Sequence, residues 1–401
     1  MASMKVVLAY SGGLDTSVAI KWIREKYDAD VITLTMDLGQ NEDLGAAKEK
    51  SLMLGSLKHF TADVRDEFVR DYVAPSIKAN GLYEGKYPLA TALGRPLIAK
   101  KLVEVAEDEG AQAVAHGCTG KGNDQVRLDV TVRALNPGLK IIAPVREWGL
   151  SRDQEMRYAA EKGVPVSAKK NAFSIDQNLW GRSIESGVLE DASFEPPAEA
   201  FEWVTPAEEA PDKATYVTVG FEGGVPSSLG GSELKLPQII SELNAVAGRN
   251  GVGVVDHIED RLVGIKSREV YECPAATVIL EAHRELEKMV LNRHQLNFKR
   301  MVDTVWSDMV YTGLWVDPLK TDLDAFIDST QKKVDGTVRV KLYKGGLRVV
   351  GRSSPNSLYD ANLATYSSSS TFNQQHAEGF IEFWGLPSRV ASRRAQRVTV
   401  R

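Results

Sequence analysis

Cysteine is scarce in this chain of 401 residues, which contains only Cys118 and Cys273. Two cysteines are too few for a disulfide framework, and their spacing matches no metal-binding motif. The sequence also lacks any apolar run near the roughly 20 residues that a membrane helix needs. The residues before Lys5 are too short for a signal peptide. We therefore expect a protein of the reducing cytoplasm.

A large excess of charge of one sign is also missing. Lysine and arginine total 49 and aspartate and glutamate total 54, which gives a formal net charge of −5. This mild acidity provides no electrostatic reason to expect a nucleic-acid partner. The length exceeds what a single hydrophobic core usually serves, so more than one domain is expected.

Residues 9–17 lack the Gly-Lys-Ser/Thr end of a Walker A loop and the third glycine of a dinucleotide fingerprint. They do place Gly12 and Gly13 between an apolar run that predicts a buried strand and a run that predicts a helix. Backbone N–H groups at such a turn are unpaired, and the helix dipole adds positive charge, so the turn is a predicted phosphate site. The alternative is a glycine-rich turn with Asp15 and Thr16 as ordinary helix caps.

The order Ser11-Gly12-Gly13-Leu14-Asp15-Thr16 resembles the pyrophosphate-binding loop of the N-type ATP pyrophosphatases. Members of that superfamily cleave ATP between the α and β phosphates. The resemblance implies that the glycines and hydroxyls hold pyrophosphate and that Asp15 helps to hold Mg²⁺.

From Lys5 to about Pro165, strand-like runs alternate with helical ones, which predicts a doubly wound α/β domain with a parallel sheet. Ligands of such sheets bind beyond the carboxyl ends of the strands. Pro96 is expected to open a helix that Leu97 to Glu109 continues and Gly110 ends. The expected strands are Val6–Tyr10, Val31–Met36, His59–Val64, Ala113–His116 and Ile141–Pro144.

The remaining sequence predicts an α+β domain. A strand is expected at Tyr216–Phe221, a helix at Leu236–Ala247 and one or two long helices within Ala275–Tyr311. Alternating apolar residues on both sides of Lys344-Gly345-Gly346 predict a hairpin. We therefore divide the chain into a nucleotide-binding domain (1–165), an α+β synthetase domain (166–364) and a C-terminal oligomerisation tail (365–401).

A second polar cluster, residues 116–127, follows the expected strand at Ala113. Thr119, Asn123 and Asp124 supply a hydroxyl, an amide and a carboxylate, and Arg127 lies one helical turn beyond Asn123. Arginine is a natural partner for a carboxylate. Donors together with one acid suit an amino-acid zwitterion, with its amine at Asp124. The composition fits equally well a polar loop with a helix cap.

Together with residues 9–17, the run His116-Gly-Cys-Thr-Gly-Lys-Gly-Asn-Asp-Gln-Val-Arg127 resembles the argininosuccinate synthases, and the likeness covers nearly the whole chain. The resemblance implies ligation of citrulline and aspartate through a citrullyl-adenylate, with release of AMP and pyrophosphate, in arginine biosynthesis. It further implies Mg²⁺ and a homotetramer, with neither nucleic acid nor membrane as a partner. Asp15, Asp124 and Arg127 are the expected catalytic residues.

The resemblance also implies the binding residues, position by position. Ala92 stands where some members have serine near citrulline, so Thr91 is the hydroxyl expected there. The implied residues for ATP are Ala9, Tyr10, Ser11, Gly12, Gly13, Leu14, Asp15, Thr16, Ser17, Met36 and Gly117; for aspartate, Thr119, Asn123 and Asp124; and for citrulline, Tyr87, Thr91, Asn123, Arg127, Ser174, Ser183, Glu259 and Tyr271.

Two other functions remain open from the residues. An amidotransferase or a tRNA-modifying pyrophosphatase would share the loop, but the sequence has no N-terminal cysteine, no cysteine pair and no basic face for such chemistry. A non-catalytic nucleotide sensor would keep the loop at Ser11 without needing Asp124, Arg127 and Glu259. Citrulline-dependent formation of AMP distinguishes these functions.

Overall fold

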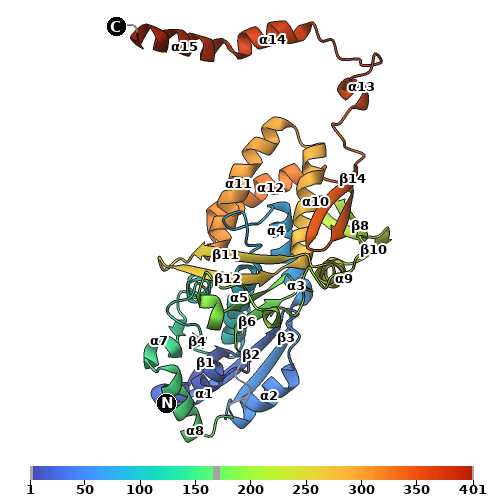
Figure 1. The fold of residues 1–401 in the computed structure, drawn as a ribbon. Coiled ribbons are helices and arrows are strands. Elements are labelled where there is room, and N and C mark those ends of the chain that lie inside the picture. Colours follow the sequence, from blue (N-terminus) through green and yellow to red (C-terminus); the bar gives the residue numbers. More distant parts are fainter. Residues whose placement is uncertain (1–2, 166–171, 400–401) are drawn as a thin grey trace. The chain divides into compact units, whose positions relative to one another are not determined.

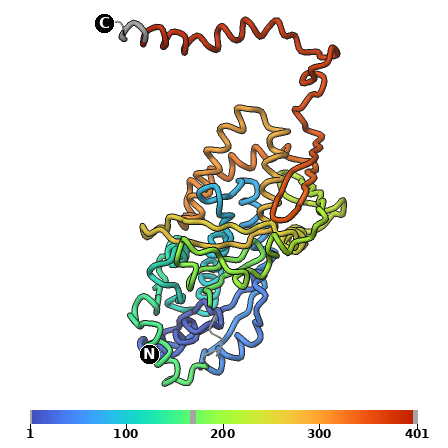
Figure 2. Tube along the Cα trace, viewed as in Figure 1, coloured from blue at the N-terminus to red at the C-terminus, as the bar shows by residue number. Residues whose placement is uncertain are grey.

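The computed structural model describes residues 3–165 and 172–399 (Figure 1). Its chain divides into two compact units, residues 1–356 and residues 357–401, which are described separately. Figure 2 traces the chain through both units. In the described ranges, no helix combines the length and apolar character that crossing a bilayer requires.

The first unit begins with a parallel sheet. Its strands are β1 (Met4–Ala9), β2 (Ala29–Asp37), β3 (Lys58–Asp63), β4 (Ala113–Ala115) and β5 (Lys140–Ile142). Their order is β3-β2-β1-β4-β5, and every neighbouring pair is parallel. The chain runs outward from β1 to β3 and then crosses to β4 on the other side of β1. The carboxyl ends of β1 and β4 therefore flank the switch point at which such sheets bind ligands.

Helices cover both faces of this sheet. They include α1 (Leu14–Tyr27), α2 (Leu44–Met53), α5 (Ala90–Asp108), α6 (Asp124–Leu135), α7 (Pro144–Trp148) and α8 (Arg152–Glu161). Successive side chains of a strand point to opposite faces. Val6 and Leu8 of β1 accordingly pack in one apolar cluster with Val18 of α1, whereas Val7 belongs to a second cluster that includes Leu93 of α5. The predicted doubly wound sheet is confirmed.

One expected helix boundary is wrong, because Pro96 does not open a helix. Helix α5 begins at Ala90 and contains Pro96 in its interior. The Tyr87 hydroxyl accepts the backbone N–H of Thr91 at 2.9 Å and so satisfies one donor of the first turn. Proline inside a helix costs roughly 3 kcal/mol. Complete burial of neighbouring side chains such as Leu97 outweighs that local preference.

The rest of the first unit confirms the predicted α+β arrangement with two antiparallel sheets. One has the order β11-β12-β7-β6 and the other β10-β9-β8-β13-β14. The expected hairpin is formed by β13 and β14. The strands are β6 (Ser174–Asn178), β7 (Gly181–Glu185), β8 (Thr215–Glu222), β9 (Val225–Leu229), β10 (Ser232–Glu233), β11 (Val254–Asp260), β12 (Lys266–Glu272), β13 (Gly336–Tyr343) and β14 (Gly346–Ser353).

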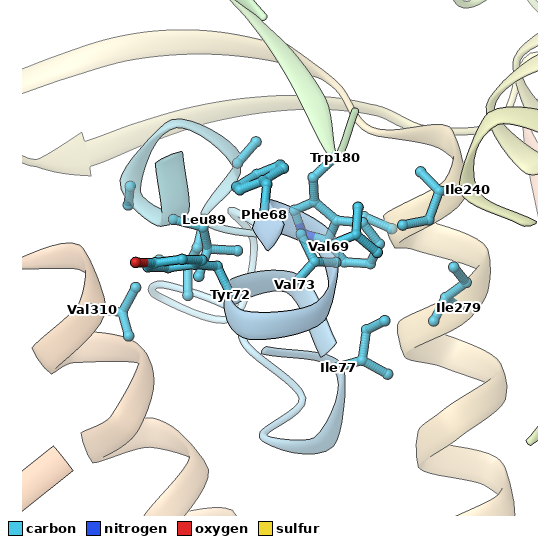
Figure 3. Packing of buried hydrophobic residues seen from close by; sticks show 14 of the residues in the cluster. Phe68, Val69, Tyr72, Val73, Ile77, Leu89, Trp180, Ile240, Ile279 and Val310 are labelled. Carbon is cyan, nitrogen blue, oxygen red and sulfur yellow. The ribbon is translucent and has the colours of Figure 1, made fainter. Parts of the chain in front are cut away.

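Helices α9 (Leu236–Arg249), α10 (Pro274–Val290), α11 (Arg293–Tyr311) and α12 (Pro318–Gln331) complete this part, so the expected long helical stretch is two helices. A helical segment of the first half, formed by α3 (Arg65–Phe68), η1 (Val69–Val73) and α4 (Ala74–Lys78), packs among them. Figure 3 shows its side chains Phe68, Val69, Tyr72, Val73 and Ile77 among Leu89, Trp180, Ile240, Ile279 and Val310. One continuous core therefore joins the first 165 residues to the residues that follow.

The second unit consists of α13 (Ala361–Ala364), α14 (His376–Trp384) and α15 (Leu386–Thr399). Helix α14 exposes four large apolar side chains, and the rings of Phe380 and Trp384 stack with centroids 5.4 Å apart. Exposed apolar patches of this kind mark interaction surfaces. The four side chains are Phe380, Ile381, Phe383 and Trp384.

Candidate functional site

The phosphate-binding loop connects β1 to α1. The N-cap residue of α1 is Gly13, which has no side chain to occupy the N–H groups of the first turn. Gly12 has a φ of +77°, a conformation that glycine adopts without strain. The hydroxyls of Ser11 and Thr16 are hydrogen-bonded at 3.1 Å. Asp15 and Thr16 lie inside the first turn rather than at the cap, so the loop leaves its N–H groups to an anion.

Met36 and Gly117 lie at the ends of the strands beside this loop. Met36 is buried near the end of β2, the strand that pairs with β1 in the sheet. A side chain at Gly117 would place its Cβ 3.0 Å from Thr16 Cγ2. A larger residue would require Thr16 to shift by a few tenths of an ångström, so glycine suits the close approach of the loop after β4 to the phosphate loop. Lys50 of α2 also reaches the loop and donates to the Gly12 carbonyl at 2.8 Å, a contact that no sequence pattern indicates.

Asp15 shares a cation with a second carboxylate. Arg152 Nη1 lies 2.5 Å from Asp15 Oδ1 and 3.0 Å from Glu155 Oε2. Arg152 and Glu155 belong to α8, whereas Asp15 lies in the first turn of α1. Burial, with the nearby Asp15 charge, raises the pKa of Glu155 to about 7. In the ranges that the structure describes, no three or more Asp, Glu, His or Cys side chains gather as a metal site. A carboxylate pair beside a phosphate loop nevertheless fits Mg²⁺, which takes one or two carboxylates together with phosphate oxygens.

The substrate loop ends at α6, where Asp124 faces two arginines. Its carboxylate lies 2.7 Å from Arg95 Nη2 and 2.9 Å from Arg127 Nη1. Burial raises the pKa of Asp124, but the two arginines outweigh burial and hold it below its usual value. Asn123, rather than Asp124, is the N-cap residue of α6, and its side chain makes no capping hydrogen bond. Thr119 is exposed in the loop, five residues earlier.

The Arg127 guanidinium is buried but only partly used. Nε donates to the Tyr311 carbonyl at 2.9 Å and Nη1 to Asp124, and the group lies 4.8 Å from the centre of the Tyr311 ring. Nη2 is buried and has no hydrogen-bond partner among the described residues. A buried donor left unpaired is unfavourable by about 1–3 kcal/mol. The group is therefore prepared to donate to a ligand's oxygen.

The residues implied for citrulline in the second half share one face of a single sheet. Register pairs Ser183 with Asp176 of β6 and with Tyr271 of β12. Ser174 lies two residues before Asp176, and alternation places it on the same face. Glu259 of β11 completes this face, because its hydrogen bond joins it to Tyr271. These four strands thus present side chains far apart in sequence to one side.

Three tyrosines and Glu259 form a buried polar centre on that face. The ring of Tyr87 stacks on that of Tyr271 with centroids 4.2 Å apart, and its hydroxyl is 2.6 Å from that of Thr91. Tyr271 and Tyr311 donate to Glu259 at 2.7 and 2.8 Å. Burial raises the pKa values of Tyr271 and Tyr311 well above the usual range, so both remain hydroxyl donors.

Asn123 connects the two halves of the site. Its side-chain Nδ2 donates to the Tyr311 hydroxyl at 2.8 Å, and its Oδ1 accepts the backbone N–H of Leu262 at 2.9 Å. Both amide atoms therefore have partners from the second half of the chain. The predicted citrulline residues other than Ser174 and Ser183 are joined to this network by hydrogen bonds or ring contacts. Ser183 donates to the Asp176 carbonyl instead, so Ser174 and Ser183 belong to the site by their position on the face.

Sequence reasoning did not assign roles to Arg95, Arg152, Glu155, Asp176 and Tyr311. Arg95 and Asp176 lie in segments typical of the family, and Arg95 contacts both Asp176 and Asp124. The resemblance of these two segments to the family was the one signal in the sequence that could have indicated Arg95 and Asp176. Tyr311 lies 184 residues from Arg127, and its place at the site follows from packing alone.

A parallel α/β sheet with a glycine-rich anion loop at its switch point defines a nucleotide-binding protein of the ATP-pyrophosphatase class. Two family models match the chain: the arginosuccinate synthase N-terminal HUP domain over residues 5–165 and the arginosuccinate synthase C-terminal domain over residues 173–391. The chain belongs to the argininosuccinate synthase family, whose members are ligases.

Curated relatives named argininosuccinate synthase match nearly end to end. The chain is 56% identical over 388 residues to one from Pyrococcus furiosus, which covers 97% of this chain and 94% of the relative. It is 56% identical over 398 residues to one from Bacillus cytotoxicus, with 99% of each covered. It is also 56% identical over 392 residues to one from Symbiobacterium thermophilum, with 97% and 98% covered.

Proposed function

We propose that the protein joins citrulline and aspartate to form argininosuccinate, with ATP converted to AMP and pyrophosphate, in arginine biosynthesis. The observation that carries this proposal is the close approach of Gly117 to Thr16, with 3.0 Å between a Cβ at Gly117 and Thr16 Cγ2. It brings the phosphate loop against the loop that leads to Asp124 and Arg127. A nucleotide and an amino-acid substrate would therefore lie side by side.

The ureido oxygen of citrulline is a poor leaving group and must first be activated. It attacks the α-phosphorus of ATP, which forms an O–P bond, breaks the α–β bridge and leaves pyrophosphate in the Gly12–Ser17 loop. The aspartate amine then forms the C–N bond, loses a proton and displaces AMP. Placement and charge stabilisation account for catalysis of this kind without a protein nucleophile.

The contacts of the side chains support the roles that we propose for them. Arg127 Nη2 donates to the citrulline carboxylate, and Glu259, held by Tyr271 and Tyr311, binds the citrulline amine. Asp124 binds the aspartate amine, with Thr119 and Asn123 beside it. Tyr87, Thr91, Ser174 and Ser183 complete the citrulline pocket. Residues 9–17, Met36 and Gly117 hold ATP.

Asp15 is the proposed protein ligand of Mg²⁺, which neutralises the departing pyrophosphate when bound. We also propose that the chain acts in the cytoplasm as a homotetramer, with residues 365–401 as the oligomerisation tail. Residues 1–165 and 166–364 are the proposed nucleotide-binding and synthetase domains, although both contribute to one compact unit.

The test is an assay of purified protein with ATP, Mg²⁺ and aspartate, with and without citrulline. AMP and pyrophosphate should form in equal amounts only when citrulline is present. ADP and inorganic phosphate as the primary products would overturn the proposal. Nucleotide binding without citrulline-dependent AMP would instead identify a sensor.

A further inference from the structure

Glu155 is a buried carboxylate next to the phosphate loop that the proposed reaction does not use. The residue is 5% exposed, in the first turn of α8. Its Oε2 atom contacts Arg152, whereas Oε1 is buried and has no hydrogen-bond partner within the described chain. A buried carboxylate oxygen without a donor is costly, so the absence of a partner points to a missing ligand.

The carboxylate faces the phosphate loop through Arg152. A single nitrogen, Arg152 Nη1, contacts Glu155 Oε2 at 3.0 Å and Asp15 Oδ1 at 2.5 Å. Two carboxylates within reach of one nitrogen repel each other unless a cation or a shared proton lies between them. Arg152 is that cation in this structure.

Arg152 and Glu155 differ in how easily their side chains can move. The Arg152 side chain is 62% exposed, so water can replace its contacts at little free-energy cost. Glu155 is fixed, because Ser151 and Gln154 form a capping box at the start of α8 and Ala159 packs in the core beneath the sheet. A ligand can therefore displace the arginine and leave the carboxylates in place.

We propose that Glu155 is a second protein ligand, beside Asp15, for the divalent cation that accompanies the nucleotide's pyrophosphate. Arg152 occupies the cation's place in its absence and turns to the phosphate oxygens when it binds. Hard divalent cations prefer oxygen ligands, and a site built from two carboxylates and phosphate is typical of Mg²⁺ with nucleotides. This proposal rests on the proposed function, because it requires the phosphate loop to bind ATP.

The experiment measures Mn²⁺ as a paramagnetic probe, by electron paramagnetic resonance, in the presence of the non-cleavable analogue α,β-methylene-ATP. Glu155→Gln keeps the shape of the side chain and removes its charge, and Asp15→Asn does the same in the loop. Both variants should raise the Kd for Mn²⁺ about tenfold or more. Asp153→Asn is the matched control, because it removes an exposed charge from the same turn of α8 and should leave the Kd unchanged.

A second variant tests the place of Arg152. Arg152→Gln removes the competing cation, so Mn²⁺ should bind more tightly to the nucleotide-free protein than to the wild type. Unchanged Mn²⁺ affinity in Glu155→Gln, or no tightening in Arg152→Gln, would overturn the proposal. Failure of the wild type itself to bind Mn²⁺ with the analogue would also overturn this proposal, whereas the proposed function is tested separately by the citrulline-dependent formation of AMP.

Discussion

At the scale of the residue, Arg127 has a buried guanidinium with two nitrogens in hydrogen bonds and one without a partner among the described residues. Two of its three nitrogens are fixed by Tyr311 and Asp124, which leaves Nη2 directed by the rigid plane of the guanidinium. Lysine carries the same charge but cannot reproduce this planar fork.

Arg127→Lys should therefore raise the KM for citrulline about tenfold to a hundredfold, as expected for loss of a charged hydrogen bond worth about 1.5–3 kcal/mol. Steady-state kinetics with citrulline as the varied substrate measure this. A citrulline analogue without the carboxylate should be used equally poorly by both proteins. If the analogue still distinguishes them, Arg127 acts through the fold.

Asp124 is predicted to separate the two half-reactions. Asp124→Asn keeps the size of the side chain and one acceptor oxygen, which can serve only one of Arg95 and Arg127, and it loses the charge proposed to hold the aspartate amine. Citrulline-dependent exchange of labelled pyrophosphate into ATP should persist, while argininosuccinate formation falls about a hundredfold, since misplacement of a nucleophile is costly.

Asn123→Ala is the comparison for this variant, because Asn123 is expected to contact both amino acids and should impair both assays. Equal losses of exchange and synthesis in Asp124→Asn would remove Asp124 from the aspartate site.

Among the elements, the sheet β11-β12-β7-β6 carries the proposed citrulline residues on one face and is held together on its other face by a buried ion pair. Glu272 of β12 is fully buried and contacts Arg182 of β7 at 2.6 Å. The same carboxylate accepts the N–H groups of Trp203 and Val204 at 2.8 Å. The pair therefore joins two strands and a loop.

Glu272→Gln should lower the free energy of unfolding by about 3–5 kcal/mol, because it leaves the buried Arg182 charge with only the solvent-exposed carboxylate of Glu202, 3.5 Å away, as its counter-charge. Urea denaturation followed by circular dichroism measures the change. Asp260→Asn breaks the exposed pair with Lys266 on the same sheet and should lower stability by about 1 kcal/mol or less. Equal effects would contradict the burial argument.

The elements of the first half were predictable because a parallel sheet is encoded by local apolar runs, and its five strands agree with the expected ones within two residues. The start of α5 was not predictable, because the preference of proline for the first position of a helix was outweighed at Pro96 by burial of the neighbouring side chains. The phosphate loop was also predictable from the sequence, because its glycines lie between two adjacent runs that predict a strand and a helix. Ser183, Glu259 and Tyr271 lack any local signal: strand pairing alone brings them to one face, so only a family resemblance could indicate them.

At the scale of the whole molecule, the apolar side of α14 bears on assembly. Its side chains Phe380, Ile381, Phe383 and Trp384 are 60–79% exposed in the single chain. Burial of such residues between subunits would contribute about 25 cal/mol for each Å² of apolar surface removed from water. The proposed tetramer offers a partner for this surface.

Light scattering at micromolar concentration should give the mass of four chains. Phe383→Asp should shift the protein to smaller species, because a charge would enter the apolar contact. Gln374→Asp adds the same charge at an exposed polar position of the tail and should leave the mass unchanged. A wild-type monomer would contradict the proposed assembly.

The hydrogen bonds of Asn123 bear on how the site can be changed by engineering or by evolution. Its one amide joins the loop after β4 to Leu262 and Tyr311 of the second half. The substrate pocket is therefore not a transferable module. A chimaera that exchanged either half with a distant relative would separate matched partners, so a new substrate preference would require changes in both halves together.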